Sequence, residues 1–393
     1  MQFKSKISLF IVAAFMVVAS QLAAATFKVQ PYLIYPDDNT AMTLLWKTEG
    51  KAKSTSVQWG ESESYGKKAT KVTEFGNGHY KFSIKGLKPA TRYYYKVTVD
   101  GQDENGFFYS APKADVSRVT FYALGDTRYG LTKTQNTEKL AKVMLKDIDS
   151  DIKRKNTFCL HSGDWGSFDS EFFSRKQPTF QYITSRIPVM GARGNHDGSS
   201  FRQYYPYVGT DKNGAGNHKF EYGPACVVSC TSTAPNSSHY KWIEDQLKST
   251  TKKTKIILLH HPGWSAYAKK NKGSTRDMQA LFEKNGVSLV ITGHAHVYSR
   301  SMVNGIPHIT FGSGSPTREV NPELPKVTIA EAGCHYMRVD IDGDDLTTTT
   351  YRLNGSVIET FRLKVPVIPT LNDGATDDVG KKSKKSKKSK KKK

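Results

Sequence analysis

The chain has 393 residues, of which 37% are hydrophobic, and a formal net charge of +22 at pH 7. This length is ample for a hydrophobic core and allows two domains, or one large domain with an appendage. Ten lysines lie in the last thirteen residues and two in the first six, which leaves a net charge of +10 for the rest of the chain. The composition therefore excludes a strongly and uniformly basic body.

The N-terminal residues have the pattern of a secretory signal peptide. A basic start precedes an apolar run over residues 7–19, and Ala23-Ala24-Ala25 supplies an A-x-A cleavage site. The run is too short to span a bilayer stably, and no other run approaches the length of a transmembrane segment. We therefore expect residues 1–25 to be a signal peptide and the protein to be secreted or otherwise extracytoplasmic.

Residues 26–114 alternate in the way expected of an all-β sandwich. Short runs such as TAMTLLW and TSVQWG are separated by Gly, Asp and Lys turns, which is typical of antiparallel strands. The segment LKPATRYYYKV resembles the L-x-P-x-T-x-Y signature of fibronectin type III domains, with Tyr93 as the corner tyrosine. We predict a fibronectin type III-like domain here, followed by a linker.

Residues 118–365 show apolar strands that alternate with helical segments and end in polar loops. Helices are expected at residues 134–148, 237–248 and 274–286, the last with Ser274 as its N-cap. Such alternation predicts an α/β domain that keeps its chemistry on the loops at the strand ends. After Gly333 the sequence returns to plain β-strands, which finish a sheet at the end of this region.

Residues 366–393 form a lysine-rich tail that ends in KKSKKSKKSKKKK. Like charges repel one another, so the tail is predicted to be disordered. It is either a solvated segment or a contact for an anionic polymer or an acidic cell surface. Serine and lysine supply charge without aromatic stacking, so any such contact would be non-specific and sensitive to salt.

The four cysteines are Cys159, Cys226, Cys230 and Cys334. Export permits disulfides, and four cysteines allow three full pairings, between which the sequence does not choose. Cys159 lies in the apolar run FCLHSGD, where a buried small hydrophobic side chain is expected.

Five polar blocks follow five predicted strands of the α/β region. They contain oxygen and imidazole donors without a thiolate: Asp126, Asp164, Asn195 with His196, His260, and His294 with His296. Such a mixed set suits zinc, iron or manganese, and it is larger than one tetrahedral ion requires. The blocks therefore predict two ions that share a bridging carboxylate.

In this order, the blocks resemble the calcineurin-like metallophosphoesterases, and in particular the purple acid phosphatases. That branch carries a fibronectin-like domain ahead of its two-metal catalytic domain. The segments GHAHVYSRS and IPHITFGSGSP are also similar, as is the helix SSHYKWIEDQL before KIILLHH. The resemblance extends from residue 28 to residue 365 and implies a metallophosphoesterase domain, a two-sheet β-sandwich core flanked by helices.

The resemblance implies two divalent or trivalent metal ions, of Fe, Zn or Mn, held by six side chains. The implied ligands are Asp126 and His296 for the first metal, Asn195, His260 and His294 for the second metal, and Asp164 as the bridge. His196 would stabilise charge on the phosphate or protonate the leaving oxygen. Arg128 and His261 are further candidates for contact with the phosphate.

Two departures from the family pattern concern the first metal. The tyrosine that ligates ferric iron in purple acid phosphatases is Ser167 here, and the histidine of the D-x-H block in other branches is Arg128. The first site keeps only Asp126, Asp164 and His296 from the pattern. We therefore expect a colourless enzyme that uses exchangeable divalent ions.

The implied function is that of an exported, acid phosphatase-like phosphoric ester hydrolase. It would hydrolyse small phosphomonoesters by attack of a metal-bound hydroxide at a dinuclear site. A phosphodiesterase or nucleotidase is an alternative that the same metals would serve. A binding protein for anionic polymers, with a degenerate metal site, is an alternative of another class, against which the complete second-metal set argues.

Overall fold

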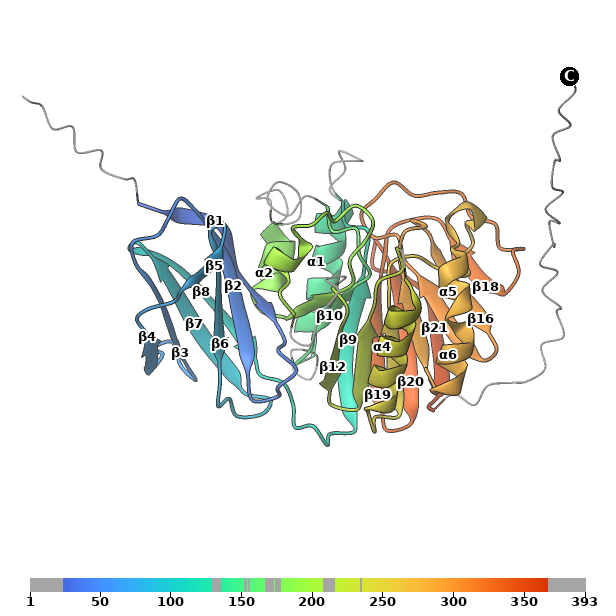
Figure 1. Ribbon diagram of the computed structural model, residues 1–393, viewed down its shortest axis with the longest axis horizontal. Coiled ribbons are helices and arrows are strands. Elements are labelled where there is room, and N and C mark those ends of the chain that lie inside the picture. Colours follow the sequence, from blue (N-terminus) through green and yellow to red (C-terminus); the bar gives the residue numbers. More distant parts are fainter. Residues whose placement is uncertain are drawn as a thin grey trace, which may run out of the picture.

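The computed structural model describes residues 24–128, 136–151, 154, 156–166, 173, 178–207, 216–233 and 235–366. Within these residues the chain forms an N-terminal β-sandwich and a larger α/β domain, which lie side by side along the long axis of the molecule (Figure 1). The all-β domain followed by an α/β domain confirms the predicted fold class. Nearly all of the predicted signal peptide and tail lies outside the described residues.

Two four-stranded antiparallel sheets form the N-terminal domain, in the orders β1-β2-β6-β5 and β4-β3-β7-β8. The strands are β1 Thr26–Ile34, β2 Met42–Glu49, β3 Thr55–Gly60, β4 Lys67–Ala69, β5 Glu74–Gly76, β6 His79–Ile84, β7 Arg92–Val99 and β8 Gln102–Tyr109. Between the sheets, Trp46 stacks on Tyr80. The Tyr93 hydroxyl accepts a 2.9 Å hydrogen bond from the Lys88 backbone N–H, which is the contact expected of a corner tyrosine.

Two mixed sheets form the α/β domain, in the orders β11-β10-β9-β19-β20-β21 and β12-β13-β14-β15-β17-β16-β18. The first contains β9 Arg118–Leu124, β10 Cys159–His161, β11 Val189–Gly191, β19 His335–Asp342, β20 Asp345–Arg352 and β21 Val357–Lys364. The second contains β12 His218–Tyr222, β13 Ala225–Ser229, β14 Thr254–Leu258, β15 Leu289–Thr292, β16 Tyr298–Val303, β17 Ile306–Thr310 and β18 Val327–Glu331. Side chains from both sheets, such as Phe121 and Ile291, form one buried cluster, so the sheets share a core.

Parallel pairing positions the loops of this domain. β9, β10 and β11 are parallel neighbours in the first sheet, and β13, β14, β15 and β17 are parallel neighbours in the second. The carboxyl ends of parallel neighbours lie at one edge of their sheet, so the loops that follow them are brought together.

The helices are α1 Asn136–Asp149, α2 Pro178–Thr184, α3 Phe201–Tyr204, α4 Ser237–Lys248, the short 3₁₀ helix η3 Ala268–Lys270, α5 Gly273–Asp277 and α6 Gln279–Lys284. The predicted helices at 134–148 and 237–248 correspond to α1 and α4. Among the described residues, no helix is both long and apolar enough to cross a membrane.

The third predicted helix differs in its start and in its continuity. It begins at Gly273 and is interrupted at Met278, so the prediction of Ser274 as N-cap is wrong. The N-cap is Lys272, which has an extended backbone and makes no side-chain cap. Its N–H donates a 2.8 Å bond to the Pro262 carbonyl, and this tertiary contact places the start of the helix ahead of the local capping signal.

The two domains also share a core. Tyr32 and Tyr35 of the sandwich belong to the main hydrophobic cluster of the α/β domain. The Tyr32 hydroxyl donates a 2.5 Å bond to the backbone carbonyl of Tyr204 in α3, and the Lys47 ammonium lies 2.7 Å from the Tyr204 hydroxyl. The sandwich therefore packs directly against α3, the helix that follows the loop containing Asn195.

All four cysteines are buried and free. Cys159 lies in β10 and is 1% exposed, which confirms its prediction as a small buried hydrophobic side chain. Cys226 and Cys230 belong to the cluster that packs α4 on the second sheet.

A buried histidine in β17 makes a pH-dependent contribution to stability. His308 is buried, and its Nε2 lies 2.9 Å from Gln279 Oε1, so Nε2–H is the donor. Burial lowers the pKa of His308 from 6.5 to about 3. As the pH falls, His308 in the unfolded chain is protonated near pH 6.5, before the buried ring of the folded protein. The contribution of neutral His308 to the free energy of unfolding is therefore complete above pH 6.5 and is lost as the pH falls towards 3.

We therefore expect the free energy of unfolding to fall between pH 7 and pH 4.5 by about 2 kcal/mol more in the wild type than in His308→Gln. Glutamine keeps a donor for Gln279 and does not titrate. Urea unfolding at the two pH values measures the difference, and parallel pH dependences would contradict the prediction.

Candidate metal centre

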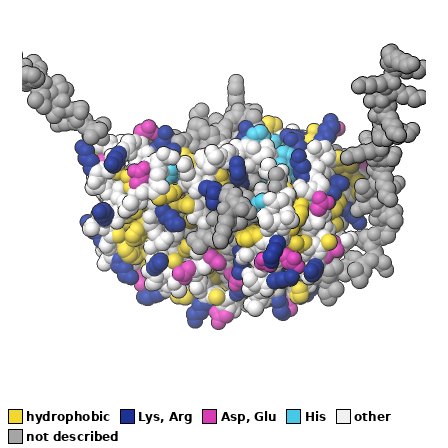
Figure 2. All heavy atoms as spheres, viewed as in Figure 1, with side chains coloured by type: hydrophobic (Ala, Val, Ile, Leu, Met, Phe, Trp, Pro, Cys, Tyr) yellow, Lys and Arg dark blue, Asp and Glu magenta, His cyan; other side chains and the backbone are white. Residues whose placement is uncertain are grey.

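The loops that follow five strands of the two sheets meet at one edge of the α/β domain. The predicted site residues lie on these loops: Asp126 after β9, Asp164 after β10, Asn195 and His196 after β11, His260 and His261 after β14, and His294 and His296 after β15. Histidine side chains gather near the upper edge of this domain, beside Lys and Arg side chains (Figure 2). Ligand atoms of Asp126, Asp164 and His260 lie within 4.8 Å of one another.

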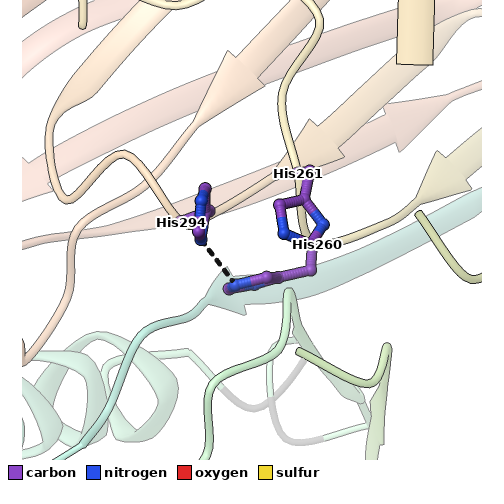
Figure 3. A group of neighbouring side chains, drawn as sticks. All are labelled: His260, His261 and His294. Carbon is purple, nitrogen blue, oxygen red and sulfur yellow. Dashed lines mark hydrogen bonds between the residues drawn. The ribbon is translucent and has the colours of Figure 1, made fainter. Parts of the chain in front are cut away.

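Three potential metal-ligand atoms lie around Nε2 of His260. Its Nε2 lies 3.1 Å from Asn195 Oδ1, 3.2 Å from His294 Nδ1 and 3.3 Å from Asp164 Oδ1. Figure 3 shows the His260 and His294 rings turned toward each other. The other ring nitrogen of His260 donates to the Ser162 carbonyl at 2.9 Å, so in the neutral ring Nε2 carries a lone pair. The lone pairs on His260 Nε2 and Asn195 Oδ1 face each other and repel. A cation bound between the two atoms would remove this repulsion.

Asp126 and His296 form a second pair of potential metal ligands. His296 Nε2 lies 3.3 Å from Asp126 Oδ1, and His296 Nδ1 donates to the Pro316 carbonyl at 2.9 Å. This again leaves the inward nitrogen with a lone pair. Asp126 Oδ1 is buried and has no hydrogen-bond partner among the described residues. A buried carboxylate oxygen without a donor is costly, and a bound cation would satisfy it.

Backbone strain coincides with these donors. Asp126, Asp164, His294 and His296 have φ of 54°, 56°, 66° and 56°, in the left-handed region that non-glycine residues rarely adopt. Each such residue costs on the order of 1 kcal/mol or more, and such strain persists where the surrounding structure enforces it, typically at functional sites. Four of the six predicted metal ligands therefore lie at strained backbone positions.

Two glycines allow the loops to close on the carboxylates. A Cβ added to Gly194 would lie 2.3 Å from Asp164 Oδ1, and one added to Gly293 would lie 2.4 Å from Asp126 Oδ2. Any side chain at either position would therefore displace a predicted ligand. The close approach also lets the backbone N–H of His294 donate to Asp126 Oδ2 at 2.8 Å.

Asp197, which the sequence analysis did not single out, holds the loops around Asp164. Its carboxylate accepts from the backbone N–H groups of Asp164 at 3.0 Å, of Trp165 at 2.7 Å, and of Gly194. Burial, and next the neighbouring charge of Asp164, raise the pKa of Asp197 to about 7. Its position at the end of the block GNHD was the only sequence signal for this role.

His196 is the most exposed of the predicted catalytic groups. Its side chain is 49% exposed, and its Nε2 lies 4.0 Å from Asp164 Oδ2. Partial burial lowers the pKa of His196, and the positive charges of Arg128 and Lys270 lower it further. Burial, and next the neighbouring His260, lower the pKa of His261 and His294, and the Lys270 ammonium lowers both further. Lys270, in η3, is thus a positive charge near these histidines that the sequence did not indicate, because its loop contains no recognisable block.

His261 lies behind the His294 ring rather than at the surface. The two rings are neighbours (Figure 3), with centroids 4.3 Å apart. His261 Nδ1 lies 2.9 Å from the Ser232 hydroxyl. That hydroxyl accepts from the His261 backbone N–H, so its own hydrogen is free to donate to Nδ1. Burial lowers the pKa of His261 to about 3. Ser167, at the position of the purple tyrosine, lies outside the described residues.

Comparison with known proteins gives two family matches. Residues 119–298 match the family described as calcineurin-like phosphoesterase, and residues 29–121 match the purple acid phosphatase N-terminal domain. Purple acid phosphatase 18 of Arabidopsis thaliana is 26% identical over 320 residues, which are 70% of this chain and 68% of that protein. Purple acid phosphatase 23 of the same plant is 24% identical over 307 residues, 67% of this chain and 64% of that protein.

Solved structures show the same fold. Purple acid phosphatase PPD1 from yellow lupin (Lupinus luteus) seeds aligns with a TM-score of 0.73 at 18% identity, over 87% of this chain and 74% of that chain. A structure of PhoD aligns with a TM-score of 0.66 at 12% identity, over 85% and 92% of the two chains. The chain spans about two thirds of the length of the curated relatives named above.

The fold, the ligand residues at the strand ends and these matches show a calcineurin-like phosphoesterase domain in residues 119–298, which supports a phosphoric ester hydrolase. The match of its N-terminal domain and the relatives named above make the chain purple acid phosphatase-like.

Proposed function

We propose that the protein is an exported phosphatase that hydrolyses small phosphomonoesters at a site for two metal ions. The observation that supports this most is the pair of donor sets that meet at Asp164. His260 lies 3.3 Å from Asp164 and carries Asn195 and His294 within 3.2 Å of its Nε2, while Asp126, 3.3 Å from His296, has a ligand atom within 4.8 Å of those of Asp164 and His260.

Six side chains would hold the two cations. His296 and Asp126 would bind the first metal and Asn195, His260 and His294 the second, with Asp164 as the bridge. The bound cations would supply an activated water and neutralise charge that develops on the phosphoryl oxygens. The carbonyl contacts of His260 and His296 support these roles, because they fix the tautomer that leaves each inward nitrogen free to bind a cation.

Four further groups would act on the substrate. Arg128 and Lys270 would attract and orient the phosphate, since both charges act on the exposed His196. The Ser232 hydroxyl favours a proton on His261 Nε2, which would donate to a phosphate oxygen. Protonated His196 would donate its proton to the leaving oxygen. Both Asn195 and His196 are exposed, and an open site of this kind supports small and varied phosphomonoesters as substrates.

Chelation is expected to abolish hydrolysis of p-nitrophenyl phosphate, with a loss of about 10³-fold or more, because the electrostatic stabilisation comes from the cations. Restoration with single divalent ions, Zn²⁺, Mn²⁺ or Fe²⁺, should recover activity and give a colourless protein. Metal analysis, visible absorption and initial rates measure these outcomes. Unchanged activity after complete metal removal would refute the proposal, and a purple protein would refute the exchangeable divalent first site.

Bis(p-nitrophenyl) phosphate provides the matched comparison for substrate class. Faster turnover of this diester than of the monoester would favour the phosphodiesterase alternative. Export and a non-specific contact of the lysine-rich tail with anionic polymers remain predictions, since both segments lie outside the described residues.

A further inference from the structure

A buried chain of hydrogen bonds links the two turns that present Asp126 and Asp164. The backbone N–H of Gly163 lies 3.2 Å from His161 Nδ1, and His161 Nε2 lies 2.9 Å from the Thr127 hydroxyl. The Thr127 hydroxyl in turn lies 3.3 Å from the Trp165 carbonyl. This series of hydrogen bonds therefore joins Thr127, the residue after Asp126, to Gly163 and Trp165, the two residues that flank Asp164.

The direction of every bond in this chain is fixed by chemistry. The Gly163 N–H can only donate, so His161 Nδ1 accepts, and the neutral ring carries its proton on Nε2. Nε2–H then donates to the Thr127 hydroxyl, whose own hydrogen is left for the Trp165 carbonyl. One tautomer satisfies all three contacts, and a charged imidazole would break the first of them.

Packing holds the hydrogen-bonded side chains in fixed positions. His161, Thr127 and Trp165 are all buried, and the His161 and Trp165 rings stack with centroids 3.7 Å apart and an interplanar angle of 15°. Burial also lowers the pKa of His161 well below its ordinary value, which keeps the ring neutral. The Gly163 carbonyl accepts from the Asp126 N–H at 2.9 Å, so a single residue, Gly163, is hydrogen-bonded within both turns.

We propose that His161 and Thr127 are positioning residues that set the spacing of Asp126 and Asp164, and through them the binding of the first metal. This inference rests on the proposed function, because it concerns the same two-metal site. The first site has three donors from the family pattern, Asp126, Asp164 and His296. With so few ligands, affinity depends strongly on how accurately the two carboxylates are placed, and outer partners of ligands typically contribute 10–100-fold to metal affinity.

A matched pair of variants tests the proposal in the full chain. Thr127→Val removes the hydroxyl and keeps the shape, whereas Thr127→Ser keeps the hydroxyl. Metal-free protein is titrated with Mn²⁺, with binding followed by calorimetry and the coupling of the two ions by electron paramagnetic resonance. We expect the wild type and Thr127→Ser to bind two coupled ions. Thr127→Val should keep one wild-type site, weaken the other about 10–100-fold and lose the coupled signal.

Circular dichroism establishes that the variants are folded. If Thr127→Val does not fold, His161→Phe replaces it, because phenylalanine retains the stacking on Trp165 and lacks both ring nitrogens. A folded variant of either kind that binds two Mn²⁺ ions with wild-type affinity and coupling would overturn the positioning role. A wild-type protein that binds no Mn²⁺ and hydrolyses no phosphate ester would overturn the proposed function instead.

Discussion

The His294→Ala variant is expected to hydrolyse p-nitrophenyl phosphate about 10³-fold or more slowly than the wild type. His294 Nδ1 is one of the donors that meet at His260, and its loss leaves Asn195, His260 and Asp164 to hold the second metal. A weakly bound cation cannot stabilise charge at the phosphoryl group, so the loss should appear in both kcat and metal content.

Steady-state kinetics and metal stoichiometry on the same preparation measure this effect. His308→Gln is the matched control, because it also replaces a buried histidine of the second sheet but lies outside the donor sets. Activity of His294→Ala within tenfold of the wild type, with two metals retained, would contradict the assignment of His294.

The His196→Ala variant is expected to lose activity in proportion to the basicity of the leaving group. An alkyl phosphate such as glycerol phosphate releases an alkoxide that needs a proton, so the loss should reach about 10²–10⁴-fold. The p-nitrophenolate group leaves without one, so its ester should be affected far less. A merely structural role for His196 would depress both substrates equally.

The direction in which kcat changes with pH follows from the pKa of His196. The pKa of His196 lies below its ordinary 6.5, because of partial burial and the charges of Arg128 and Lys270. Its acid form therefore accumulates only as the pH falls, and kcat for the alkyl ester should rise on acidification below 6.5 in the wild type. A pH profile with the same rise in His196→Ala would assign the proton donor elsewhere.

The sequence was sufficient for the features that depend on local pattern. Alternation identified the sandwich, and each apolar strand that ends in a polar block identified a loop of the site. Asp126 and Asp164 could be singled out because each directly follows a strand, and parallel neighbours present their ends at one edge of a sheet.

The remainder depends on contacts between distant segments. Asp197 acts by accepting hydrogen bonds from residues 33 and 32 positions earlier, and the direction of its side chain is set by the fold. Lys270 approaches the histidines because the loop that bears it returns to the Pro262 carbonyl through Lys272. Because of the same contact, α5 begins at Gly273 and not after Ser274, so a local capping rule could not have predicted its first residue.

The packing of Tyr32 and Lys47 against Tyr204 also bears on how the molecule can be divided. A fragment that begins at β9 would leave Tyr204 and the neighbouring aromatic side chains facing water, at the helix next to the Asn195 loop. The sandwich is thus an integral support of α3 rather than a transferable module. Fusion or dissection of this protein should treat residues 26 to 365 as a single unit.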